Sequence, residues 1–300
     1  MGVSQMKNKP LISIIMPVYN TPEDFFIPSV KSILNQTYEN IEFIIVDDGS
    51  TTNIKSIVET FYDERIIYIN EGHHGAGEAR NIGIKASNGE YIYVIGSDDT
   101  LENNALEFCI NIMQKHDADI VSFNICGQNN SGDITVCNSP VPFNITKPGD
   151  ATQIVKKSLI EENKIKYENL TSCNDVTFTF TAIAFAKKVV KINKTFYHYN
   201  MNVPGQISSS RGKKAMNIFL AFDALKRNLK NKNMFDVYEN IFNRQFADCV
   251  EYEIQNIHDK DYKENFLSTL KEKYKPIYDL VFPNNNNNTK IKRTQKHKFF

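Results

Sequence analysis

Short apolar segments alternate with amphipathic segments through the first 124 residues, and this alternation is what most constrains the fold. The apolar segments have the length and the β-branched, aromatic composition of strands buried on both faces. The expected strands are residues 11–16, 41–46, 65–69, 91–95 and 120–124, and the expected helices are 25–37, 50–62, 75–86 and 101–116. Such alternation predicts an α/β fold of the Rossmann-like kind, a mostly parallel sheet with flanking helices.

Polar residues follow three of these strands directly. Asp98 and Asp99 come after residues 91–95, Asp47-Asp48 after the second strand and Tyr19-Asn20 after the first. Parallel strands would bring these ends to one edge of the sheet, where ligands of open α/β sheets bind. Adjacent carboxylates repel each other unless a cation lies between them, so an Mg²⁺ or Mn²⁺ ion carrying a diphosphate would suit this edge. The alternative is that Asp99 only caps a helix beginning near residue 102.

The composition excludes several classes of protein. Basic and acidic residues both number 35, so no net charge favours nucleic acid as a partner. The five cysteines form no CxxC pair, which argues against a disulfide framework or a zinc site and for a reducing compartment. Residues 1–10 lack the apolar core of a signal peptide, and no apolar run approaches the length of a membrane span. We therefore expect a cytoplasmic protein, at most peripheral at the inner face of the cell membrane.

The second half of the chain is more irregular. The expected elements are helices at 151–162 and 174–186, strands at 188–192 and 195–199, and helices at 215–229, 235–257 and 262–274. Asp175 opens the second of these helices, where it could be a catalytic carboxylate or simply a first-turn acid favoured by the helix dipole. We divide the chain into an α/β domain at 1–212, a C-terminal helical region at 213–283, and an Asn-rich linker with a basic tail at 284–300.

Dinucleotide binding is the obvious competing hypothesis for this topology. It requires glycines in the turn after the first strand, and Pro17-Val18-Tyr19-Asn20 supplies none. The glycines at 72, 75 and 77 follow a later strand and predict a flexible loop. His73 and His74 within that loop are expected to be exposed to solvent rather than bound to a metal.

Four ordered motifs resemble the family 2 glycosyltransferases with the GT-A fold. They are ISIIMPVYN, SVKSILNQTYENIEFIIVDDGS, ARNIGIKASNGEYI and the SDD sequence after the strand at 91–95. The resemblance is dense from residue 12 to about 124 and thinner through Asn174-Asp175 and FYHYN. It implies an inverting transfer of a hexose or N-acetylhexosamine from a nucleotide diphosphate, usually UDP, to an acceptor hydroxyl.

The resemblance also implies roles for residues on the donor side. Pro17, Val18, Tyr19 and Asp48 would hold the base and ribose, and Arg80 would lie near the nucleotide. Ser97 and Asp98 complete the nucleotide-sugar site.

Asp98 matches the metal-coordinating second Asp of the family's DxD motif, and the cofactor would be Mn²⁺ or Mg²⁺. Gly96 replaces the first Asp of that motif, which puts the usual ribose contact in question. Asp99 and His198 are further candidate metal ligands. Asp175 takes the place of the base that removes the acceptor proton.

Two other functions stay open: a nucleotide-sugar-binding protein without catalysis, and a sugar nucleotidyltransferase. The nucleotidyltransferase would normally carry a Gly-rich basic loop after the first strand. For the glycosyltransferase, we expect an oligosaccharide or lipid-linked glycan acceptor of bacterial lipooligosaccharide or capsule synthesis. Residues 289–300 carry five Lys and Arg residues, no acid and a Phe-Phe end, which would suit contact with an anionic membrane if the tail is not simply solvated.

Overall fold

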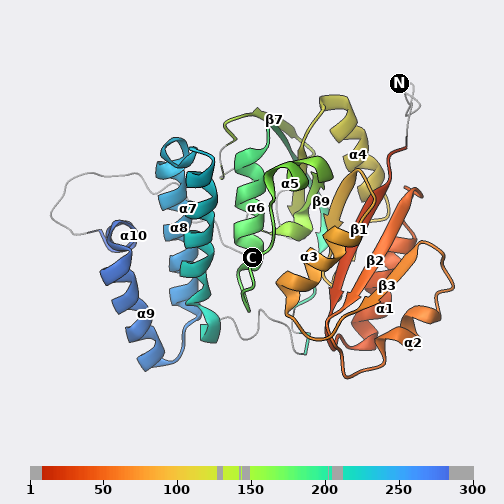
Figure 1. Cartoon of the computed structure of the whole chain (residues 1–300), viewed down its shortest axis with the longest axis horizontal. Helices are drawn as coiled ribbons and strands as arrows, with labels where there is room; N and C mark the ends of the chain where they lie inside the picture. Colours follow the sequence, from red (N-terminus) through yellow and green to blue (C-terminus); the bar gives the residue numbers. More distant parts are fainter. Residues whose placement is uncertain are drawn as a thin grey trace.

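The computed structural model describes residues 9–126, 131–141, 143, 149–201, 203–204 and 212–283. In these residues nine strands form one mixed sheet with the order β3-β2-β1-β4-β8-β6-β9-β5, and β7 pairs with β9 beside this path. Helices cover both faces of the sheet, and a bundle of C-terminal helices packs at one side (Figure 1). The predicted α/β class, with flanking helices and a helical C-terminal region, is confirmed.

The parallel half of the sheet is built as the sequence pattern predicts. It contains β1 (Ile12–Val18), β2 (Ile41–Asp47), β3 (Ile66–Asn70) and β4 (Tyr91–Val94), joined by α1 (Glu23–Leu34), α2 (Ile54–Glu59) and α3 (Ala76–Ala86). All pairs among these four strands are parallel, and Val18 lies opposite Asp47, which lies opposite Asn70. The polar residues after β1, β2 and β4 therefore meet at one edge.

The other half is more antiparallel than we expected. β8 (Gln153–Lys156) runs antiparallel between β4 and β6 (Ile120–Ile125). The predicted helix at 151–162 is thus wrong over its first half: η2 (Asp150–Thr152) precedes β8, and α5 (Lys157–Asn163) follows it. The buried β-branched residues Ile154 and Val155 fill the gap between two strands, and this packing overrides the helical pattern.

A single long strand replaces the two short ones predicted at 188–192 and 195–199. This strand, β9 (Lys188–His198), pairs in parallel with β6 and antiparallel with β5 (Thr100–Leu101) and β7 (Ile134–Asn138). Because residues 100–101 belong to β5, α4 (Ala105–His116) begins four residues later than predicted, after Asn104. The reading of Asp99 as a helix cap is therefore wrong.

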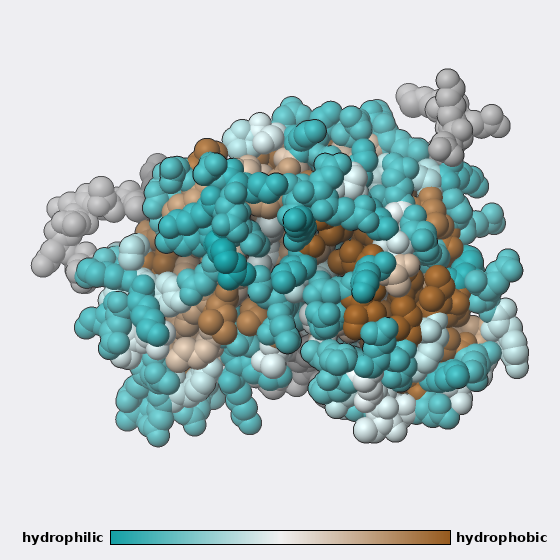
Figure 2. All heavy atoms as spheres, in the orientation of Figure 1, coloured by the Kyte–Doolittle hydropathy of each residue, from teal (hydrophilic) through white to brown (hydrophobic). Residues whose placement is uncertain are grey.

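One helix lies between the sheet and the C-terminal bundle. α6 (Asn174–Phe185) is buried from Asn174 to Ala184 except at Asp175. Its outer side packs on α7 (Asn217–Asn231), which contacts α8 (Phe235–Asn256), and α9 (Lys260–Lys273) and α10 (Lys275–Val281) complete the bundle. No helix among the described residues is long and apolar enough to cross a bilayer. Figure 2 shows a mainly hydrophilic face, with apolar surface gathered over β1, β2 and β3 beside α3.

A buried carboxylate ties the amino ends of the parallel strands together. Glu42 of β2 accepts hydrogen bonds from the Ser13 hydroxyl at 2.5 Å and from the backbone N–H groups of Asn88 and Gly89 at 2.5 and 3.1 Å. Burial by itself raises the pKa of Glu42, but these hydrogen bonds outweigh it and the net pKa is lowered. β1, β2 and the turn before β4 are thus held by one ionised group.

We predict that Glu42→Gln destabilises the protein by about 1–3 kcal/mol near pH 7, because an amide cannot accept from all these donors. Since the folded-state pKa of Glu42 lies below its unfolded value, its contribution is complete above the unfolded pKa. It is lost as pH falls through the folded pKa. The difference in free energy of unfolding between wild type and variant, measured with urea, should therefore shrink at acid pH. Glu39→Gln, at an exposed position in the preceding turn, is the control, and a pH-independent difference would contradict the argument.

Candidate active site

Two adjacent carboxylates follow β4, and they lie in different surroundings. Asp98 is half-buried, whereas Asp99 is only 3% exposed. Asp99 accepts hydrogen bonds from the Tyr197 hydroxyl and from the backbone N–H of Asn200, the latter at 2.8 Å. Burial, and then the charge of Asp98, raise the pKa of Asp99 to about 7. Through these two hydrogen bonds, Asp99 therefore joins β9 and the residues after it to the end of β4.

Gly96 is required by this packing. A Cβ atom at position 96 would lie 2.6 Å from Asp99 Oδ2 and 3.1 Å from Asp98 Oδ1. The room that a side chain at 96 would need is thus taken by the two carboxylates, which flank this glycine. This packing explains why the first Asp of the DxD pattern is replaced by Gly96: an acid at this position would displace Asp99 from Tyr197.

The two acids at the end of β2, Asp47 and Asp48, have different hydrogen-bond partners. Asp47 accepts from the backbone N–H of Ser50 at 2.8 Å, from the Tyr68 hydroxyl at 2.6 Å and from the Asn70 amide at 3.3 Å, so it fixes the ends of β2 and β3. Asp48 instead faces the loop before α3. It accepts from the backbone N–H of His74 at 2.6 Å and of Gly75 at 3.0 Å.

His73 joins Asp48 to the turn after β1. Its Nδ1 lies 3.0 Å from Asp48 Oδ2, and its ring stacks on Tyr19 with centroids 4.4 Å apart. Tyr19 thus covers a face of the His73 ring while Asp48 contacts its edge, a geometry that would also suit a flat base with an N–H group. The His73 side chain is 58% exposed, in keeping with the prediction of an exposed loop, but its contacts were not foreseen.

The first turn also reaches the end of β4. The Thr21 and Ser97 hydroxyls lie 2.6 Å apart, and the backbone N–H of Asp48 donates to the carbonyl of Val18 at 2.8 Å. Pro17 and Val18 are the last residues of β1, so their backbone borders the crevice while the Val18 side chain is buried. The candidates from three strands therefore form one continuous edge.

Arg80 lies on the other side of this edge. Its Nε is 2.8 Å from Asp150 Oδ2, and its Nη1 donates to Asn174 Oδ1 at 3.4 Å. Its guanidinium lies 5.3 Å from the centre of the Tyr167 ring. Burial lowers the pKa of Arg80, but the charge of Asp150, followed by Tyr167 and Asp175, raises it above its ordinary value. Through its hydrogen bond to Asn174, Arg80 therefore contacts the start of α6, one residue before Asp175.

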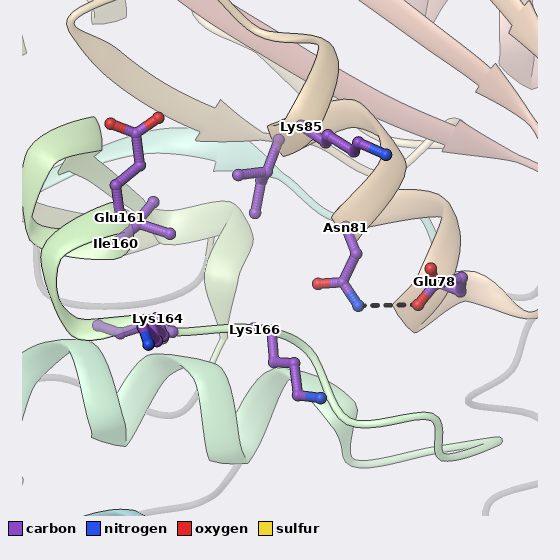
Figure 3. A pocket seen from close by; sticks show the side chains of 9 residues that line it. Glu78, Asn81, Lys85, Ile160, Glu161, Lys164 and Lys166 are labelled. Carbon is purple, nitrogen blue, oxygen red and sulfur yellow. Dashed lines mark hydrogen bonds between the residues drawn. The ribbon is translucent and has the colours of Figure 1, made fainter.

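One cavity among the described residues lies away from the two acids. It has a volume of about 520 Å³ between α3 and the segment after α5, and Lys85, Lys164 and Lys166 are among its lining residues (Figure 3). The Asn81 amide in this cavity donates to Glu78 at 3.0 Å, as Figure 3 shows, and also to the Tyr167 carbonyl at 3.0 Å. Asn81 thus holds the segment before α6 against α3, and we assign the cavity no ligand.

His198 is not brought to the two acids. Its Nε2 lies 2.5 Å from Glu102 Oε1, whereas its strand neighbour Tyr197 reaches Asp99. Consecutive residues of a strand point to opposite faces, so the buried Tyr197, which contacts Asp99, and His198, which contacts Glu102, lie on different sides of β9. No group of three or more His, Cys, Asp or Glu residues that could hold a metal occurs in the described part of the chain. A hard cation would find its protein ligand at Asp98, because both carboxylate oxygens of Asp99 accept hydrogen bonds from Tyr197 and Asn200, and donor phosphates would supply further oxygens.

Comparison with known proteins agrees with this geometry. The family described as glycosyl transferase family 2 matches residues 13–181. Glycosyltransferase GlyG of Streptococcus pneumoniae is 43% identical over 114 residues, 37% of this chain and 38% of that protein. Poly(ribitol-phosphate) β-N-acetylglucosaminyltransferase TarS of Staphylococcus aureus is 24% identical over 257 residues, 78% of this chain and 44% of that protein. This chain thus spans less than half the length of either relative.

Solved structures share the fold. Residues 1–349 of S. aureus TarS in complex with UDP-GlcNAc align with a TM-score of 0.59 and 21% identity, over 90% of each chain. The mannosyltransferase PcManGT from Pyrobaculum calidifontis, in complex with GDP-Man and Mn²⁺, aligns with a TM-score of 0.59 and 14% identity, over 88% of this chain and 76% of that one.

The mixed sheet with its flanking helices thus has the GT-A fold. More narrowly, the chain belongs to glycosyl transferase family 2.

Sequence reasoning missed three residues of the site. Asp150 and Tyr167 lie in stretches with no periodic pattern, and neither carries a motif. Tyr197 lies inside the FYHYN sequence, for which the family resemblance predicts His198, and not Tyr197, as a site residue. Neighbouring residues of a strand face opposite sides of the sheet, so only one of Tyr197 and His198 could contact the acids. The sequence alone does not say which one.

Proposed function

We propose that this protein transfers a hexose or N-acetylhexosamine from a UDP-sugar to a hydroxyl of a glycan acceptor, with inversion at the anomeric carbon. The observation that carries the proposal is the parallel register that brings the ends of β1, β2 and β4, followed by Tyr19, Asp48 and Asp98, to one edge. Arg80 donates to Asn174, the residue directly before Asp175. The acceptor would be an oligosaccharide or lipid-linked glycan of bacterial surface-glycan synthesis. TarS and a relative from Bacillus spizizenii are named as a poly(ribitol-phosphate) β-N-acetylglucosaminyltransferase and a poly(ribitol-phosphate) β-glucosyltransferase, which supports the transfer of a sugar.

The residues divide the work of donor binding. The uracil would take the place of the His73 ring. Tyr19 would then stack on the uracil, and Asp48 would accept a hydrogen bond from the N–H of the uracil. Pro17 and Val18 would border the base and ribose, Ser97 would line the sugar nucleotide, and Arg80 would provide the nearest cation. Asp98, supported by Asp99, would hold an Mn²⁺ or Mg²⁺ ion, which when bound stabilises charge on the leaving diphosphate.

Asp175 would act on the acceptor. It is the one residue from Asn174 to Ala184 of α6 that is not buried, and it directly follows Asn174, which accepts a hydrogen bond from Arg80. As a general base it would take the acceptor proton while the oxygen attacks the face of the sugar opposite the diphosphate. His198 would have to leave Glu102 to join a metal, so we place it outside the metal site.

Donor binding is the direct test of this function. A thermal-shift screen of UDP-sugars with Mn²⁺ should raise the melting temperature with the true donor, because ligands that bind only the folded state stabilise it. Donor hydrolysis with and without Mn²⁺ then separates an enzyme from a sugar-nucleotide-binding protein, the alternative that Gly96 favours. Formation of a UDP-sugar from UTP and a sugar phosphate would instead indicate the nucleotidyltransferase.

Asp98→Asn should abolish Mn²⁺-dependent binding of UDP, because an amide is a far weaker ligand for a hard cation than a carboxylate. Asp99→Asn should mainly lower thermal stability, because Asp99 is buried against Tyr197 and Asn200. Calorimetry of UDP binding with and without Mn²⁺ measures the first effect. Undiminished metal-dependent binding in Asp98→Asn would refute the metal assignment.

Asp175→Asn should keep the affinity for the donor within a few-fold but reduce turnover by at least ~10²-fold, the usual scale for a general base. Asp236→Asn, at a first-turn acid of α8, is the matched control. If Asp175→Asn yields no folded protein while Asp236→Asn folds normally, Asp175 is a helix-terminus residue rather than the base.

The basic tail lies outside the described residues, and its contact with membranes stays a prediction. Each basic residue near an anionic surface contributes about 1 kcal/mol, weakening with salt. Deleting residues 289–300 should leave activity on a short soluble acceptor intact and reduce sedimentation with anionic vesicles at low salt. Equal sedimentation of the truncated and full chains would show that the tail is only a solvated end.

A further inference from the structure

Four parts of the chain meet at the Arg80 side chain. Nη1 donates to the Ala76 carbonyl of α3 at 3.2 Å and to Asn174 of α6 at 3.4 Å. Nε lies 2.8 Å from Asp150 of η2, and the guanidinium lies over the ring of Tyr167. Arg80 and Asp150 are 16% and 9% exposed, so water contributes little to this cluster. A charged side chain so enclosed fixes the positions of its neighbours, because any shift would leave a buried charge without its partner.

Tyr167 is held at its backbone, its ring and its hydroxyl. Its backbone N–H donates to Asn81 Oδ1 at 2.9 Å, and its carbonyl accepts from the same amide at 3.0 Å. Its ring stacks on Phe178 of α6, with centroids 4.1 Å apart and planes within 4°. Its hydroxyl donates to Asp150 Oδ2 at 2.8 Å. Arg80 and Asn81, consecutive residues of α3, therefore grip Tyr167 by its side chain and its backbone.

These contacts of Tyr167 fix the segment that leads into α6. The segment from 164 to 173 runs from α5 to Asn174 and Asp175, and Tyr167 anchors its middle. A second close contact lies one turn nearer the start of α3, where a Cβ at Gly77 would meet the Glu168 carbonyl at 2.6 Å. The helix that borders the donor crevice and the helix that carries Asp175 are thereby joined through one tyrosine.

We propose that Asp150 and Tyr167 are positioning residues of the transfer reaction. They hold Arg80 against the first turn of α6 and so fix Asp175 relative to the donor crevice. This inference rests on the proposed function and adds to it two residues that touch neither the donor nor the reacting atoms. Misplacing a reacting group by about 1 Å can cost 10²-fold in rate, so a defect here should appear in turnover rather than in donor binding.

The test uses conservative variants of the full chain. Asp150→Asn and Tyr167→Phe should each lower kcat by roughly 10- to 100-fold while the KM for the UDP-sugar stays within about threefold. Tyr274→Phe is the matched control, because it removes another Tyr–Asp hydrogen bond, 2.7 Å long to Asp223, within the C-terminal helices. A kcat within twofold of wild type in both site variants would overturn the proposal.

A double variant distinguishes positioning from general damage. If Asp150 acts through Arg80, adding Asp150→Asn to Arg80→Met should lower kcat by less than twofold further, whereas independent effects would multiply. Hydrogen exchange over residues 164–176, measured without substrate, should be faster in Tyr167→Phe than in wild type and Tyr274→Phe. Unchanged exchange refutes the docking itself, even if Asp150→Asn fails to fold. A wild-type protein that transfers no sugar would instead refute the proposed function.

Discussion

Parallel pairing of β3, β2, β1 and β4 is the constraint on which the site depends. It places the end of every strand at one edge, so short polar sequences far apart in the chain become neighbours without long loops. The hydrogen bonds of Glu42 fix the opposite end of the same strands, and the contact between Thr21 and Ser97 joins two of the turns at the crevice. β1 is therefore joined to the segments before and after β4 by side-chain hydrogen bonds at both of its ends.

Repulsion between the neighbouring carboxylates of Asp98 and Asp99 is a second constraint, and the two acids differ in how deeply they are buried. Asp98 and Asp99 are adjacent, but Asp99 is withdrawn into contact with Tyr197 and only Asp98 is left at the surface of the crevice. On the other side, Arg80 Nε lies 2.8 Å from Asp150 Oδ2, and its Nη1 donates to Asn174, the residue before Asp175. This edge thus combines two adjacent acids after β4 with a separate acid, Asp150, that is paired with a buried arginine.

The sequence could predict the parallel half of the fold and the edge at which its polar residues meet, because β1, β2 and β4 are short apolar runs followed at once by polar residues. It failed where tertiary packing decides the local structure. Ile154 and Val155 form a strand because β4 and β6 leave a gap, and residues 100–101 pair with a strand almost a hundred residues away. Asp150 and Tyr167 could not be found because their contacts depend on how an irregular segment folds back on α3.

The burial of α6 bears on how such a chain can be divided into modules. The Thr177 hydroxyl donates to the Ala221 carbonyl of α7, and the Asn228 amide of α7 donates to Thr181. The Asn217 amide reaches Thr171 and Ser172, directly before the helix of the proposed base. The C-terminal helices therefore form the outer wall of the helix that presents Asp175. Exchange of this bundle between related chains would be tolerated only where its inner surface is kept, whereas its outer surface, with Leu220 and Val237 exposed, is free to diverge.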